Sequence, residues 1–145
     1  MEFIRHDSIE DGLRQLGRVY LCGNLSKDNV IQHIPTDDYE IGISDYPEYT
    51  FEKAHIHRFN KEYNYILEGS MKIFLLTKKQ EFTFNKGDLF VIDTNEPYVG
   101  KAQPGTRTLF SKVPGGNDKE LIEMPAPLLK WGESWNSSYV EEVKS

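Results

Sequence analysis

Apolar and polar residues alternate through the middle of this chain. Residues 39–44 read Tyr-Glu-Ile-Gly-Ile-Ser, so nearly every second side chain is apolar, which predicts a β-strand with one buried face. Turn residues such as Gly, Asn, Asp and Pro separate the segments of this kind. We expect strands at residues 19–22, 30–34, 39–44, 50–58, 63–68, 71–77, 82–84, 88–93, 98–102, 107–113 and 121–124. Many short strands without helix–strand alternation predict an all-β sandwich or barrel.

The two ends of the chain depart from this alternation. Residues 8–16 begin with a serine that suits a helix N-cap, and apolar residues then recur near helical spacing, which predicts a short helix or a turn. Prolines at positions 125 and 127 predict extended backbone. We therefore expect one domain with N-terminal strands and turns that pack on a barrel (residues 1–38), a barrel core (residues 39–113) and a C-terminal extension (residues 114–145).

Composition narrows the classes of function. The chain has 145 residues and a net charge of −6, from 17 basic and 23 acidic residues, so its surface repels nucleic acid. No apolar run approaches the ~20 residues that span a membrane, and the N-terminus is too acidic for a signal peptide. Cys22 is the single cysteine, which excludes an intrachain disulfide and is interpreted as a small buried residue. These features predict a cytoplasmic protein.

Residues His55, His57 and Glu62 suggest a metal site. Side chains two apart on a strand point to the same face, and the Cα atoms of the two histidines are then separated by roughly 6.6 Å. The polar residues 58–61 predict a turn that returns Glu62 to a position beside the pair. Two imidazoles and a carboxylate form a facial set of ligands for a divalent transition metal.

The stretch from His55 to Gly69 resembles the first motif of the cupin family: His-x-His, three or four residues, Glu, six residues, Gly. The family pattern also begins with a glycine six residues before the first histidine, where this chain has Tyr49. The second cupin motif runs from a glycine to a histidine, and its spacing from Gly87 places Tyr98 at the histidine position.

Two further departures lie inside this second motif. Asp93 and Asn95 replace the usual proline and glycine, although asparagine tolerates the left-handed conformation that a glycine supplies. The resemblance therefore extends over about residues 49–113.

The resemblance implies a cupin-type double-stranded β-helix, a jelly-roll barrel of two antiparallel sheets, with a site inside its open end. It implies metal ligands at His55, His57, Glu62 and Tyr98, with Zn, Fe, Mn or Ni as the ion. A phenol must lose its proton to bind a metal. Four roles of Tyr98 consequently stay open: a fourth metal ligand, a hydrogen-bond donor to bound water, an acid in metal-free chemistry, or a side chain that only lines the barrel. A homodimer is also expected from the family.

Three functions remain open. The first is a metal-dependent enzyme that acts on a small polar metabolite, such as a carbohydrate. The second is a metal-free isomerase or epimerase of nucleotide-linked sugars, similar to deoxysugar-modifying cupins, with His57 as base and Tyr98 as acid. The third is a small-molecule binding module without turnover.

Other conspicuous residues receive structural interpretations. His6 and His33 are expected at the surface or in the core, and charges such as Glu52 at the solvated surface. Trp131 and Trp135 predict docking of the C-terminal segment onto the barrel or a second subunit, with stacking on a sugar as the alternative. Four apolar residues are expected in the core: Phe82, Phe84, Phe90 and Ile92.

Overall fold

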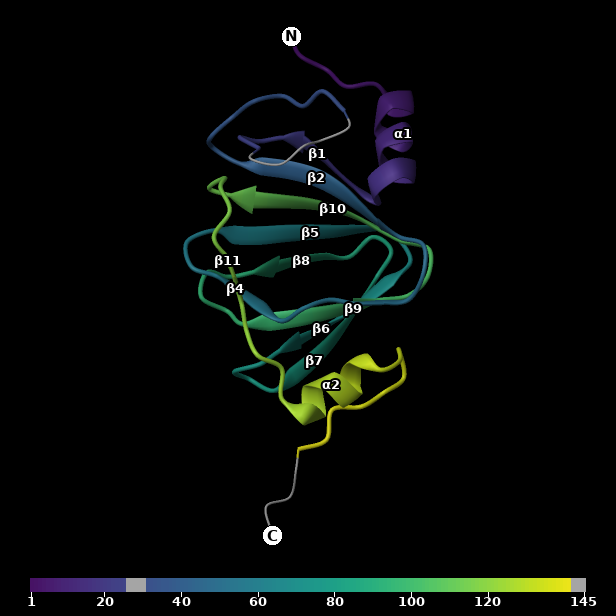
Figure 1. Ribbon diagram of the computed structural model, residues 1–145, viewed down its shortest axis with the longest axis vertical. Helices are drawn as coiled ribbons and strands as arrows, with labels where there is room; N and C mark the ends of the chain where they lie inside the picture. Colours follow the sequence, from purple (N-terminus) through teal and green to yellow (C-terminus); the bar gives the residue numbers. More distant parts are fainter. Residues whose placement is uncertain (26–30, 142–145) are drawn as a thin grey trace.

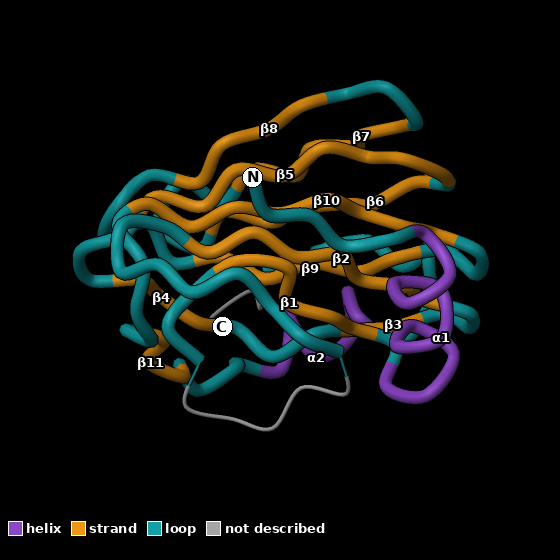
Figure 2. The backbone as a smooth tube through the Cα atoms, turned by 90° about the horizontal axis from the view of Figure 1, so that it is seen from above, coloured by secondary structure: helices purple, strands orange, loops and turns teal. Residues whose placement is uncertain are grey.

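The computed structural model describes residues 1–25 and 31–141. Two antiparallel sheets face each other as the walls of a barrel (Figures 1 and 2). The first sheet has five strands in the order β1 (Arg18–Cys22), β2 (Glu40–Tyr46), β10 (Thr106–Val113), β5 (Lys61–Glu68) and β8 (Leu89–Ile92). The all-β fold of two antiparallel sheets that the sequence predicts is therefore confirmed.

The second sheet has six strands. Five of them follow the order β11 (Lys119–Leu121), β4 (His55–His57), β9 (Tyr98–Ala102), β6 (Ser70–Leu75) and β7 (Gln80–Asn85). The short β3 (Thr50–Phe51) also pairs with β9. Strand β11 lies in the predicted C-terminal extension, so that extension contributes a strand to the barrel.

The core fills the space between the sheets. It consists of inward-facing side chains from both: Ile66, Met71, Ile73, Phe90, Ile92, Tyr98 and Ala102. Each large apolar side chain buried here stabilises the fold by about 1.5–3 kcal/mol. Phe90 and Ile92 are core residues as predicted, and Phe84 packs against the cluster. The prediction for Phe82 is wrong, because β7 is an edge strand and Phe82 is 41% exposed.

The predicted strand over residues 50–58 is interrupted. Phe51 pairs with Lys101 and His55 pairs with Tyr98, so three intervening residues oppose two on β9. An extra residue on one strand produces a bulge that bends it. The strand predicted over residues 121–124 lies instead at Lys119–Leu121, because β4 pairs with these residues. Within the predicted strand 30–34, residues 31–34 form a single bridge, Cys22 to Ile34, and residue 30 lies outside the described residues.

Two helices cover opposite ends of the barrel (Figure 1). Helix α1 (His6–Leu16) begins at Arg5 rather than at the predicted Ser8, and it ends at Gly17, whose φ of 73° is readily adopted by glycine. Helix α2 (Ala126–Gly132) replaces the extended segment predicted after Pro125, because the first turn of a helix tolerates proline. No helix among residues 1–25 and 31–141 is long and apolar enough to cross a membrane.

Helix α2 docks onto its own barrel, one of the two locations predicted for this segment. Trp131 is completely buried and packs edge-on against Phe51. The ammonium group of Lys101, also completely buried, donates hydrogen bonds to the carbonyl oxygens of Trp131, Ser134 and Ser137 at 2.7–3.0 Å. Trp131 lies in the last turn of α2, and Ser134 and Ser137 lie just beyond it, so these bonds attach the end of the helix and the following segment to β9.

Candidate metal centre

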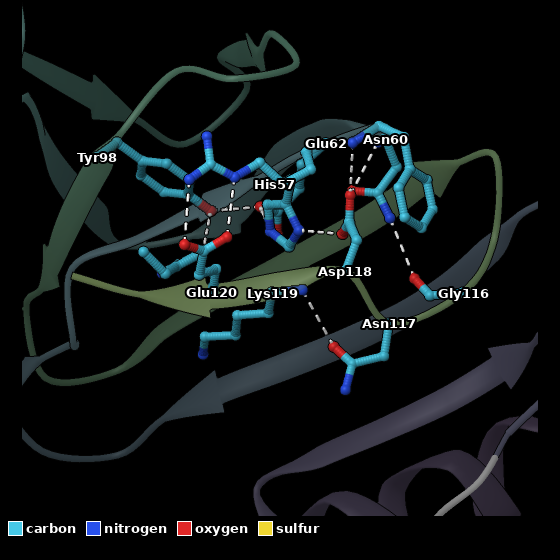
Figure 3. A network of polar contacts seen from close by, with 12 residues as sticks. His57, Asn60, Glu62, Tyr98, Gly116, Asn117, Asp118, Lys119 and Glu120 are labelled. Carbon is cyan, nitrogen blue, oxygen red and sulfur yellow. Dashed lines mark hydrogen bonds and ion pairs between the residues drawn. The ribbon is translucent and has the colours of Figure 1, made fainter.

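Three strands bring the predicted ligands together. His55 and His57 lie on β4, Glu62 follows on β5, and Tyr98 lies on β9 directly opposite His55. Figure 3 shows His57, Glu62 and Tyr98 together in the site. One ligand atom from each of His55, His57 and Glu62 lies within 4.8 Å of the other two. Residues 58–60 connect β4 to β5 in the facing sheet and place Glu62 beside the histidines as the sequence predicts, and the spacing of the second motif places Tyr98 at the same site.

The ring of His55 is held in one orientation. Its Nδ1 atom lies 2.9 Å from the carbonyl oxygen of Lys53, which only accepts hydrogen bonds, so Nδ1 carries the hydrogen. Its Nε2 atom, 3.0 Å from the hydroxyl oxygen of Tyr98, then presents a lone pair to the site. Burial lowers the pKa of His55 to about 4, which keeps the imidazole neutral near pH 7.

The ring of His57 is held in the same way by a residue that the sequence did not indicate. Nδ1 of His57 donates to a carboxylate oxygen of Asp118 at 2.7 Å, and the other oxygen of Asp118 accepts the backbone N–H groups of Phe59 and Asn60 (Figure 3). Nε2 of His57 faces Glu62 at 3.4 Å and has no hydrogen-bond partner among the described residues. The lone pairs of both imidazoles are therefore available to the same space.

Glu62 and Tyr98 form a hydrogen-bonded pair. The Tyr98 hydroxyl donates to a carboxylate oxygen of Glu62. Burial raises the pKa of Glu62, but the His57 ring 3.4 Å away, the charge of Lys112 and the hydrogen bond from Tyr98 outweigh this effect and lower it to about 2. Burial, reinforced by the Glu62 charge, raises the pKa of Tyr98 well above its usual value. Glu62 is thus a carboxylate and Tyr98 a protonated phenol at neutral pH.

A cavity of about 250 Å³ opens beside these residues. Its charged lining includes residues absent from the sequence-based site: Arg18, Glu40, Glu52, Lys112 and Lys119. The interpretation of Glu52 as a solvated charge is wrong, because the bulge turns this half-buried side chain inward, where the Tyr46 hydroxyl donates to it at 3.2 Å. Burial, the main cause, raises the pKa of Glu52.

The remaining histidines lie elsewhere. His6 is exposed on α1, 3.9 Å from Glu10, and His33 lines a separate surface hollow together with residues 23–25 and 35–37. One signal in the sequence does point to Lys112: it alternates in phase with Phe110 and Thr108 on a predicted strand, which places it on the buried face.

No protein-family model matches this chain, and no curated protein sequence matches it significantly. Solved structures do match. KdgF from Halomonas sp. aligns with a TM-score of 0.52 at 18% identity, over 57% of this chain and 74% of KdgF. The polyketide cyclase RemF from Streptomyces resistomycificus aligns with a TM-score of 0.54 at 17% identity, over 68% of this chain and 70% of RemF.

A third match names the architecture directly. An uncharacterized conserved protein with a double-stranded β-helix domain from Klebsiella pneumoniae aligns with a TM-score of 0.53 at 15% identity, over 61% of this chain and 78% of that protein. At these identities the likeness concerns the fold alone. The chain therefore has the double-stranded β-helix fold and resembles the cupin family in structure as it does in its first sequence motif.

Proposed function

We propose that this protein binds a divalent transition metal through His55, His57 and Glu62 and acts on a small polar metabolite in the adjoining cavity. One observation carries the proposal: Nε2 of His57 is buried beside Glu62 and lacks a hydrogen-bond partner among the described residues. A buried polar atom left unpaired costs about 1–3 kcal/mol. A metal ion would satisfy this atom.

The residues present fit such an ion. Metal-binding histidines commonly donate their second ring nitrogen to a carboxylate or a backbone carbonyl, as His57 does to Asp118 and His55 does to Lys53. Two neutral imidazoles and one carboxylate suit Zn, Fe, Mn or Ni. Calcium and magnesium prefer ligand sets made of oxygen atoms, so they are disfavoured.

The protein's own groups then have defined tasks. A bound ion would supply Lewis acidity, which polarises a substrate oxygen or a water molecule. Tyr98 keeps its proton and donates it to Glu62, so we assign it as a hydrogen-bond donor that positions this carboxylate rather than as a fourth ligand. Asp118 keeps the Nδ1 hydrogen on His57 and thereby holds the Nε2 lone pair in the site.

Metal-free acid–base catalysis is the second candidate, and the His57–Asp118 pair favours it. Burial lowers the pKa of His57, but the Glu62 carboxylate 3.4 Å away and the hydrogen bond to Asp118 outweigh this effect and raise it above its usual value. A raised pKa makes the imidazole a stronger base. Tyr98, on the neighbouring strand, would be the acid, and a nucleotide-linked keto sugar the substrate.

Metal content separates the two candidates. Untagged protein, reconstituted in turn with Zn, Fe, Mn and Ni, is expected to retain one of them in elemental analysis. His55→Ala/His57→Ala is expected to lose it. His6→Ala, which changes an exposed histidine on α1, is the matched control and should retain it. Metal that persists undiminished in the double variant contradicts the assigned ligands, and metal-free protein that turns over keto sugars supports the second candidate.

A further inference from the structure

The metal ligands have cationic neighbours on the adjacent strands. Lys119 on β11 pairs directly with His57, and Lys112 on β10 pairs directly with Glu62. Residues opposite each other in an antiparallel pair share one face of the sheet. Both lysines therefore lie on the faces that carry the metal ligands, and both line the cavity.

A third cation lies in the same cavity. The guanidinium of Arg18 is anchored by a hydrogen bond of 2.7 Å from Nε to the Ser44 hydroxyl and lies over the Phe110 ring. None of the ion pairs found among the described residues includes Arg18, Lys112 or Lys119. Three cations without an ion pair in one cavity are complementary to an anionic ligand.

Glu40 supplies a second, independent observation. Its side chain lines the cavity on β2 and is 7% exposed, yet its Oε2 atom has no hydrogen-bond partner among the described residues. A buried carboxylate oxygen requires a donor, which a ligand in the cavity would provide. The nearby positive charges of Arg18 and Lys112 repel an ammonium group, so a hydroxyl group is the better donor.

We propose that the cavity binds a small hydroxycarboxylate: its carboxylate lies among Arg18, Lys112 and Lys119, and its hydroxyl donates to Glu40. This inference rests on the proposed function, because it names the class of metabolite that would lie beside the metal. If Glu62 binds the metal ion, the cavity lining has three cationic side chains and two remaining carboxylates, those of Glu40 and Glu52. The excess positive charge retains the ligand's carboxylate.

Calorimetric titration with a matched series of probes tests this assignment. Malate, succinate and aspartate differ only at C2, which carries a hydroxyl, a hydrogen or an ammonium group, respectively. The probe 1,2,4-butanetriol keeps the C2 hydroxyl of malate but lacks both carboxylates. We expect malate to bind at least about tenfold more tightly than each of the others, since each of them lacks a charge-assisted hydrogen bond that malate can make. Malate binding should weaken as salt is added.

Variants separate the two halves of the subsite. Lys112→Met/Lys119→Met should bind malate at least about tenfold more weakly, whereas Lys130→Met, on the exposed face of α2, should bind it normally. Glu40→Met should remove the preference for malate over succinate, because the oxygen that would accept the ligand's hydroxyl is gone, and thermal melting shows whether the variant is folded. Equal binding of malate and succinate by the natural protein, or undiminished binding by the double variant, overturns the inference.

The titrations are run on metal-free and metal-loaded protein, and metal content is measured separately. A protein that retains no metal but prefers malate contradicts the proposed metal function and supports the hydroxycarboxylate subsite. A protein that retains metal but does not prefer malate overturns the subsite and leaves the metal assignment standing. The two failures are therefore distinguishable.

Discussion

Asp118 accepts a hydrogen bond of 2.7 Å from Nδ1 of His57, although the two residues are 61 positions apart in the chain. The contact exists because β11 pairs with β4 and brings the preceding loop alongside the histidine. The Asp118 side chain is only 2% exposed, and its second oxygen is occupied by two backbone N–H groups. The Asp118 carboxylate thus holds both the backbone of the turn after β4 and the orientation of the His57 imidazole.

Asp118→Asn should weaken metal binding by about 10–100-fold, because a neutral amide orients and polarises His57 less well than a carboxylate does. Competition with a chromogenic chelator measures the affinity. Glu120→Gln is the control, since Glu120 lies two residues further on but pairs with Arg58 at the surface. Equal affinities for Asp118→Asn and the natural protein would show that Asp118 has only a structural role.

Replacement of Tyr98 distinguishes a ligand from a donor. Tyr98→His should tighten metal binding, because an imidazole at this position binds without first losing a proton near neutral pH. Tyr98→Phe should retain the metal, since the phenol is assigned as a donor rather than a ligand. Titration of both variants with the same chelator tests the assignment. Weaker binding by Tyr98→His would place residue 98 outside the coordination sphere, and metal loss in Tyr98→Phe would make Tyr98 a ligand.

Lys101 is expected to stabilise the C-terminal segment. Burial, with the Lys72 charge, lowers the pKa of Lys101 to about 8, so the ammonium is charged at pH 7 and bonds three carbonyls. Lys101→Met removes these three hydrogen bonds and should reduce the free energy of unfolding by about 2–3 kcal/mol in urea denaturation. Lys130→Met, an exposed change on α2, should have little effect. Similar stabilities of the two variants would contradict this role.

The attachment of α1 should depend on pH. Arg107 donates hydrogen bonds to both Glu10 on α1 and Asp45 on β2, and the bond from Arg107 is the main cause of the lowered pKa of Glu10. A carboxyl whose pKa is lower in the folded than in the unfolded state stabilises the fold above its ordinary value of 4.5. That contribution is lost as pH falls through the folded-state pKa.

Glu10→Gln should therefore lower the melting temperature at pH 7, and its difference from the natural protein should shrink as pH falls below 4.5. Thermal melts across this range measure the difference. Glu123→Gln, an exposed change outside any ion pair of the described residues, is the control. A difference that persists unchanged in acid would mean that packing, rather than charge, anchors α1.

Local sequence determined much of the fold and the centre of the site. Period-two alternation predicts most of the strands within a few residues, because the side chains of a strand point alternately to the core and to solvent. The same alternation places His55 and His57 on one face, and a short connection brings Glu62 back to them. Motif spacing places Tyr98 at the same site. Each of these relations acts over short distances along the backbone or follows a family pattern.

The tertiary structure alone decided which charges face the cavity. Lys119 and Asp118 join the site because β11 pairs with β4, and Glu52 turns inward because a bulge interrupts its strand. Lys101 is buried because α2 folds over β9, although a lysine in sequence suggests solvent. Charged residues carry no local signal of burial: their environment depends on strand pairing and docking between distant segments, which no short window of sequence contains.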